Sequence, residues 1–186
     1  QGVFDYALFS ALPNVNIFDA YDERTMEDEI DLSLASDKLT IIRYPKDNVK
    51  RDVCAEFPPN ENCADYTLWN IGENTGKSIV TSGRLTARIL SLIQRSGMSG
   101  IRLIGLKKVY PIPDGAVELM GEDIILIEEN SQSGGIGEKL AAELKLRGMK
   151  NELKIKAVDD TEIPHGTLDE LYSLTGFDEI GRASCR

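Results

Sequence analysis

Residues 123–148 constrain the fold of this chain more than any other stretch. They begin with the continuous apolar run at residues 124–127, which is typical of a strand buried on both faces. A turn rich in glycine and serine follows at residues 131–137, and apolar residues then recur at every fourth position, as on one face of a helix. A strand, a glycine turn and a helix in this order predict an α/β fold with an open, mostly parallel sheet.

The same alternation extends over residues 77–179, which we predict to form one α/β domain. Thr167 and Glu170 have the spacing of a capping box, so the last helix is expected to start there. The alternating residues 152–158 predict a strand near a sheet edge. Further strands are expected at residues 78–81 and 101–106, and helices at residues 84–95 and 167–174.

The first 60 residues show a second α/β pattern. A short helix is expected within residues 1–10, a strand at residues 15–18, a helix capped near Asp22, and a strand at residues 39–44 that Pro45 ends. Along the second helix we expect an apolar stripe to face the core, formed by Met26, Ile30 and Leu34.

The other face of that helix is acidic. A metal-binding cluster is one interpretation and a solvated helix face is the other, and carboxylates near a helix start also suit the helix dipole. The acidic residues are Glu23, Glu27, Asp28, Glu29 and Asp31.

The pattern breaks between residues 48 and 76, where Pro58 and Pro59 occur without a clean period. We place an interdomain linker at residues 61–76, with a possible edge strand at residues 66–71 and with Trp69 packed onto a domain. Residues 180–186 resemble the translation of a sequencing adapter, so we treat them as an artefact and the chain as a fragment of a longer protein.

The net charge and the cysteine content argue against several classes of partner and of metal site. The formal charge of −10 argues against nucleic acid and against an anionic membrane surface as partners. No apolar run approaches the ~18 residues of a membrane span. The 3 cysteines contain no C-x-x-C pair and His165 is the only histidine, so a zinc site is not expected, and the composition fits a reducing cytoplasm.

Arg43 and Lys46 are the best candidates for chemistry from the residues alone. They stand at the end of a buried strand, and open α/β sheets bind ligands just beyond the carboxyl ends of their strands. Two cations at such a place indicate either an anionic ligand or an acidic partner. A salt bridge to the acidic helix at residues 23–31 remains an equal alternative.

Three further motifs have a functional and a structural interpretation. The turn at residues 133–137 stands at a helix start and could hold a phosphate, but it lacks the full G-x-G-x-x-G spacing, so close packing is the default. Glu128 and Glu129 could share acid–base work, yet neighbouring strand residues point to opposite faces. His165 lacks a nucleophile pattern, which favours a turn or interface role.

Four segments together resemble the 1-deoxy-D-xylulose-5-phosphate synthase family. QGVFDYALFSALPNVNIF resembles the family's H-Q-G-x-F-D motif after its histidine, and IIRYPK resembles its R-Y-P-R-G. ILIEENSQSGGIG resembles its V-E-E-N and G-G-x-G segment, and EIPHGTLDELYSLTGFD resembles its closing segment. The matches run in order over nearly all of residues 1–178, although transketolases and pyruvate dehydrogenase beta subunits share the first and third more loosely.

The resemblance implies a fold and an activity. Residues 1–60 would be the end of a pyrimidine-binding domain, and residues 77–179 a transketolase-type C-terminal domain. The family uses thiamine diphosphate and magnesium to condense pyruvate with glyceraldehyde 3-phosphate, releasing carbon dioxide. It acts as a homodimer and feeds isoprenoid and thiamine biosynthesis. The fragment alone is expected to be inactive and to bind neither cofactor.

The resemblance also assigns residues. The motif histidine would precede Gln1, so no catalytic residue of the family falls within the chain, while Gln1 and Asp5 keep motif positions near the substrate. Arg43 keeps the first arginine of R-Y-P-R, and Lys46 replaces the arginine that contacts phosphate. Lysine lacks the bidentate fork of arginine, which would alter phosphate affinity or the substrate. Ser10 is another departure, at the motif's later arginine.

Three alternatives stay open. One is a transketolase, and another is a 2-oxoacid dehydrogenase beta subunit. The third is a non-catalytic α/β module that binds a partner or an anion at residues 133–137.

Overall fold

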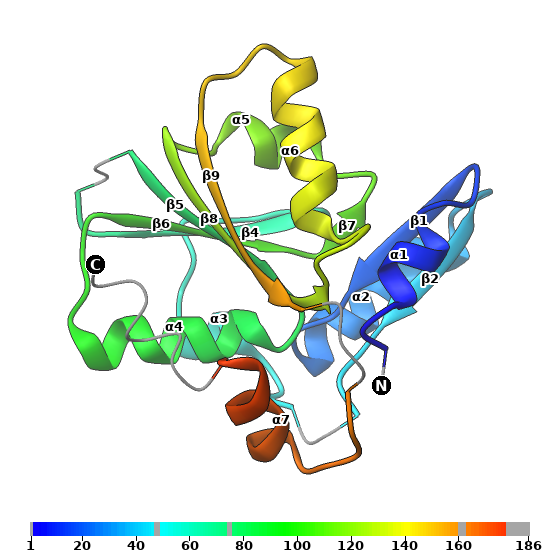
Figure 1. Cartoon of the computed structure of the whole chain (residues 1–186), viewed down its shortest axis with the longest axis horizontal. Coiled ribbons are helices and arrows are strands. Elements are labelled where there is room, and N and C mark those ends of the chain that lie inside the picture. The colour runs from blue at the N-terminus through cyan, green and yellow to red at the C-terminus, as the bar shows by residue number, and fades with distance from the viewer. Residues whose placement is uncertain (1, 47–48, 74–75, 160–162, 178–186) are drawn as a thin grey trace.

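Two sheets organise the computed structural model, which describes residues 2–46, 49–73, 76–159 and 163–177 (Figure 1). Gln1 and residues 178–186, with the predicted artefact, lie outside the described residues. The smaller sheet has the order β2-β1-β7 and the larger one the order β3-β4-β6-β5-β8-β9. The predicted α/β fold with mostly parallel pairing in the large sheet is therefore confirmed.

The smaller sheet combines both halves of the sequence. Strand β1 (Val15–Asp19) pairs in parallel with β2 (Leu39–Arg43) and antiparallel with β7 (Lys108–Tyr110). Sequence reasoning did not predict β7, which begins two residues after the strand expected at residues 101–106. The pairing ties the first 46 residues to the second half of the chain.

The larger sheet contains the stretch from which the fold was predicted. Its strands are β3 (Glu61–Asn62), β4 (Tyr66–Ile71), β5 (Lys77–Ser82), β6 (Ile101–Leu106), β8 (Asp123–Ser131) and β9 (Glu152–Val158). β5, β6, β8 and β9 pair in parallel, and β9 lies at the edge as expected. β4 pairs antiparallel with β6 along its whole length.

Strand β4 falls inside the segment predicted as a linker. It is a strand, as expected, but β3 lies outside it, so β4 is not the edge strand. Trp69 is buried and its Nε1 donates a hydrogen bond of 2.7 Å to the carbonyl of Phe57, which fixes the preceding segment to the sheet. The domain boundaries at residues 60, 76 and 179 stay a prediction.

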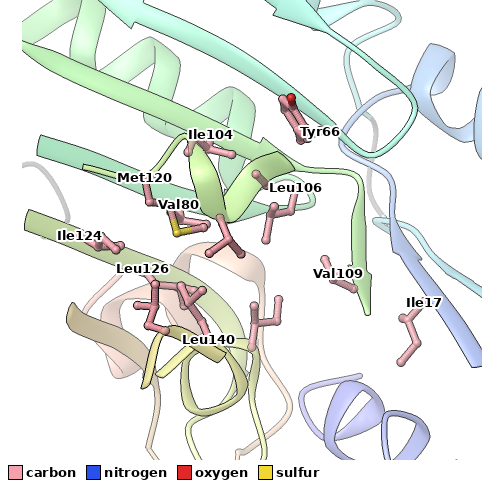
Figure 2. Packing of buried hydrophobic residues seen from close by; sticks show 14 of the residues in the cluster. Ile17, Tyr66, Val80, Ile104, Leu106, Val109, Met120, Ile124, Leu126 and Leu140 are labelled. Carbon is pink, nitrogen blue, oxygen red and sulfur yellow. The ribbon is translucent and has the colours of Figure 1, made fainter. Parts of the chain in front are cut away.

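Helices cover both faces of the larger sheet (Figure 1). On one face lie α5 (Asp114–Glu118) and α6 (Ile136–Leu146), and on the other lie α4 (Leu85–Ser96) and α7 (Leu168–Thr175). Each face has its own core cluster. Figure 2 shows the cluster on the α6 side, where Leu140 meets Leu126 and the core continues through Val109 to Ile17 of the smaller sheet.

Three further helices belong to the first half of the chain: α1 (Asp5–Phe9), α2 (Glu23–Leu34) and α3 (Val53–Glu56). Helix α1 is anchored by the buried Tyr6, whose hydroxyl donates a hydrogen bond of 3.2 Å to the carbonyl of Val109. Helix α3 was not expected from the sequence. Within the described residues, no helix is long and apolar enough to cross a bilayer.

The predicted orientation of α2 is wrong. Ile30 and Leu34, which were expected to face the core, are 40% and 82% exposed, whereas Thr25 and Glu29 are buried. The cause lies at the helix start, where the buried Asp22 accepts hydrogen bonds from the amide of Thr25 at 2.7 Å and from the amide of Val53 at 2.6 Å. Because these bonds fix the helix start against α3, the face that holds Thr25 and Glu29 turns inward.

The acidic residues of α2 therefore differ in their exposure to solvent. Glu23, Glu27 and Asp31 are exposed, as expected for a solvated face, but Glu29 is fully buried. Within the described residues, no group of three or more histidine, cysteine or acidic side chains could hold a metal ion.

Candidate functional site

A cavity of about 840 Å³ lies where the carboxyl ends of β2, β5, β8 and β9 approach α1 and α7. Such a location is the usual ligand site of an open α/β sheet. The cavity draws on both sheets, so neither half of the chain forms it alone. Its charged lining residues include Asp5, Asp19, Arg43, Lys46, Arg84 and Glu129.

The predicted site residues meet in this cavity. Asp5 lines it from α1, and Arg43 and Lys46 line it from the end of β2 and the residues that follow. Gln1 lies outside the described residues. The structure brings the three described candidates to one place, and their role in substrate binding stays a prediction.

Arg43 is engaged by an acid that the sequence reasoning missed. Its Nη1 lies 3.1 Å from Asp19 Oδ2 in an ion pair, and its Nη2 donates a hydrogen bond of 3.3 Å to the carbonyl of Gly2. The expected alternative was an acid on α2, but Asp19 is the last residue of β1. The parallel register places Asp19 directly beside Arg43, so a correct strand pairing would have revealed the contact.

Lys46 is the cation available for a ligand. Its side chain is exposed, and no ion pair or hydrogen bond to it occurs within the described residues. Pro45 ends the extended segment just before it. The ammonium therefore stands at the cavity wall without a counter-charge among those residues.

A second ion pair lines the cavity on the side of the larger sheet. Arg84 Nε lies 2.9 Å from both carboxylate oxygens of Glu129, and the Tyr172 hydroxyl donates to Glu129 Oε1 at 2.5 Å. Burial, followed by the charge of Glu129, raises the pKa of Tyr172, so the phenol stays protonated. Glu129 thus joins α4 and α7 to the end of β8, a structural role that sequence reasoning did not find.

Glu128 points the other way, into the interior. It accepts hydrogen bonds of 2.8 Å from the backbone amides of Ile136 and Gly137 and from Asn130 Nδ2. Burial raises the pKa of Glu128, and the three N–H donors act against that shift. The two adjacent glutamates therefore cannot share a proton, as the alternation along a strand predicted.

Glu128 also determines whether the amides of the glycine turn are available to bind an anion. The amides at the start of α6, which could have held a phosphate, are bound to its carboxylate. The amide of Gly134 is bound to Glu138 Oε2 at 2.8 Å. The turn at residues 133–137 therefore has the packing role that was the default interpretation.

His165 lies in the turn before α7, as expected, and it lines the cavity. The sequence alone favoured a turn or interface role and did not place this residue at the cavity that Lys46 also lines. The only sequence feature that could have indicated its place was its position just before the capping box of Thr167 and Glu170.

Comparisons with known proteins identify the relatives of this chain. No family model matches the sequence. The chain is 31% identical over 188 residues to the 1-deoxy-D-xylulose-5-phosphate synthase of Shouchella clausii and 27% identical over 185 residues to that of Clostridium tetani. These alignments cover 95% and 96% of the chain. The chain is related to the 1-deoxy-D-xylulose-5-phosphate synthases.

The similarity is to the C-terminal part of the synthases, and the chain spans 29% of the length of these two relatives. Solved structures agree on the fold. A split-gene transketolase, an inactive β4 tetramer, aligns with a TM-score of 0.73 at 21% identity over 95% of this chain and 58% of that one. A transketolase from Campylobacter jejuni gives a TM-score of 0.70 at 14% identity over 95% of this chain and 26% of that one. The fold is therefore transketolase-like.

Proposed function

We propose that this chain is the C-terminal part of a thiamine-diphosphate-dependent enzyme that condenses pyruvate with glyceraldehyde 3-phosphate to 1-deoxy-D-xylulose 5-phosphate, with loss of carbon dioxide. The relatives of that name support the proposal, because they align along nearly the whole chain. The observation that carries it is the meeting of Asp5, Arg43 and Lys46 in one cavity at the strand ends.

In the proposed enzyme, Lys46 binds the phosphate of the sugar-phosphate acceptor. Its ammonium is exposed at the cavity wall, and an ammonium–phosphate contact is a charge-assisted hydrogen bond. Asp5 lines the same cavity and offers carboxylate oxygens to a substrate hydroxyl. In this proposal both groups contact the same short polar substrate.

The cofactor belongs to the proposed whole enzyme. When bound, thiamine diphosphate supplies the carbon nucleophile that attacks pyruvate. The described residues offer no acidic or histidine cluster of the kind that holds Mg²⁺ beside a diphosphate, so they do not fit a magnesium site. The contribution proposed for this chain is therefore acceptor binding, within an enzyme that we also propose to be a homodimer.

Steady-state kinetics of the enzyme that contains this chain test the role of Lys46. Loss of a charge-assisted hydrogen bond costs about 1.5–3 kcal/mol, which corresponds to a factor of roughly 10 to 150. Lys46→Ala should raise the KM for glyceraldehyde 3-phosphate by that factor and leave the KM for pyruvate unchanged. Lys46→Arg should preserve acceptor binding, because a guanidinium can bind two phosphate oxygens.

Lys154→Ala is a matched control, since Lys154 is an exposed lysine that pairs with Glu152 on β9 and does not line the cavity. It should leave both KM values unchanged. Equal effects of Lys46→Ala on both substrates would contradict the proposed role. Turnover of a ketose donor in place of pyruvate would instead favour the transketolase alternative, and absence of any turnover would favour the non-catalytic module.

A further inference from the structure

The ion pair between Asp19 and Arg43 is built into the cavity wall. The two side chains are only 13% and 17% exposed, and they face each other as the last paired residues of β1 and β2. A mostly buried pair with a second bond from Arg43 to the carbonyl of Gly2 holds its geometry better than an exposed pair does. Arg43 therefore lines the cavity with its charge already matched.

Asp19 is held from both sheets. The same oxygen, Oδ2, that pairs with Arg43 accepts a hydrogen bond of 2.7 Å from Ser82 Oγ at the end of β5. The backbone amide of Asp19 donates to the carbonyl of Lys107 at 2.8 Å. Next to Ser82, a Cβ on Gly83 would lie 3.0 Å from both carboxylate oxygens of Asp19, so glycine leaves room for them. This carboxylate is therefore fixed independently of any ligand.

The ion pairs along the cavity wall leave one cation, Lys46, and one carboxylate, Asp5, among the described charged lining residues. Asp19 matches Arg43, and Glu129 matches Arg84. Of the lysines and arginines that line the cavity within the described ranges, Lys46 alone has no ion pair. Among the described lining residues, an anion entering the cavity meets one lysine ammonium and the carboxylate of Asp5, and no free guanidinium fork.

We propose that Asp19 is a specificity-determining residue: it keeps Arg43 from anionic ligands, so that the cavity holds a phosphate through Lys46 alone. The inference rests on the proposed function, in which both the acceptor and the product carry a phosphate. Binding the phosphate of the acceptor and that of the product equally tightly would not raise kcat, and it would slow product release. A single point charge in place of two cations keeps the phosphate weakly held.

Calorimetric titration of the 186-residue chain with glycerol 3-phosphate, a non-reacting probe, tests this at constant low ionic strength. Asp19→Asn keeps the shape and an oxygen for Ser82 but removes the charge that holds Arg43. The freed guanidinium should then tighten the Kd for the probe by about 10-fold or more. Ser82→Ala, which leaves the ion pair in place, should leave the Kd unchanged.

The double variant Asp19→Asn with Arg43→Gln separates the direct role of Arg43 from a general charge effect. It should bind the probe within about twofold of the unchanged chain, because it removes a pair without net charge. If it loses binding as Lys46→Ala does, Arg43 contacts the phosphate itself and the inference is wrong. Thermal melting would show whether Asp19→Asn folds by itself. If it does not, the Kd of the double variant for the probe still tests the inference.

Failure of the inference and failure of the proposed function give different results. Binding that Lys46→Ala weakens but that a folded Asp19→Asn variant does not tighten would overturn the inference alone. Binding that is absent from the unchanged chain but gained in Asp19→Asn through Arg43 would support the part of the inference in which Asp19 keeps Arg43 from anions, and it would overturn the part in which Lys46 holds the phosphate. A folded Asp19→Asn variant without any binding would overturn the inference.

Discussion

Glu29 is an acidic residue buried in the interior of the N-terminal half of the chain. It is fully buried on α2, and within the described residues neither carboxylate oxygen has a hydrogen-bond partner. Burial, followed by the charge of Asp19, raises the pKa of Glu29 to about 9, while Lys107 acts in the opposite direction. Glu29 is therefore a neutral acid at pH 7, because an ionised carboxylate without a partner would cost several kcal/mol there.

This burial makes stability depend on pH. The pKa of Glu29 in the folded chain, about 9, lies above the ordinary value of 4.5, so its contribution to stability is fully present below the ordinary value. It is lost as the pH rises toward the folded value, by up to ~1.4 kcal/mol per pH unit. Glu29→Gln, which cannot ionise, should remove this loss.

Urea denaturation at about pH 5 and about pH 8 measures the effect. The variant should gain stability over the unchanged chain at the higher pH, by about 1–3 kcal/mol relative to the lower pH. Glu27→Gln is the matched control, because Glu27 lies on the same helix with 70% of its side chain exposed. A difference between Glu29→Gln and the unchanged chain that does not vary with pH would show that Glu29 is ionised or solvated in the folded state.

At the scale of elements, α6 depends on a glycine where it crosses β9. A Cβ on Gly137 would lie 2.7 Å from Cγ2 and 2.9 Å from Cδ1 of Ile155, closer than packed carbons approach. Gly137→Ala should therefore destabilise the fold by about 1–3 kcal/mol, the usual cost of overpacking a core. Chemical denaturation of the variant measures it.

Gly115→Ala provides the comparison within another helix. On α5 the added Cβ would lie 3.4 Å from the Tyr66 ring, which is ordinary contact, so alanine should be neutral or stabilising by up to about 1 kcal/mol. If both variants lose the same stability, the helix preference for alanine and the space around each Cβ do not explain the result, and α6 packs differently from the arrangement in Figure 1.

At the scale of the whole molecule, the cavity and the cores depend on both sheets. Strand β7 joins the smaller sheet, and the core on the α6 side runs from Leu140 to Ile17. The chain nevertheless spans 29% of the synthases to which it is related. We therefore expect it to bind substrate phosphate weakly and to lack the complete cofactor site.

Thiamine diphosphate with Mg²⁺ tests that expectation by calorimetric titration of the chain alone. Binding should not reach micromolar affinity, because the described residues offer no metal cluster and the chain spans 29% of the length of the related synthases. A complete 1-deoxy-D-xylulose-5-phosphate synthase titrated in parallel is the positive control. Micromolar binding by the chain would mean that these residues form a cofactor site of their own.

Local signals in the sequence determined much of the fold. The apolar run at residues 124–127 predicted the buried part of β8, and the apolar repeat after it predicted α6. Asp22 and Thr167 marked helix starts, and both accept the expected capping hydrogen bonds. These features could be predicted because each depends on residues within a few positions of one another.

The sequence also placed Arg43 and Lys46 at the end of a strand, where the cavity opens. Only the tertiary structure decided that Arg43 pairs with Asp19, that Glu29 is buried, and that Glu128 takes the amides of the glycine turn. Ser82 binds Asp19 across 63 positions of the chain, and the two meet because β1 and β5 end at the same place. Such contacts follow from which strands and helices become neighbours in space, and a periodic pattern along the chain carries no information about that.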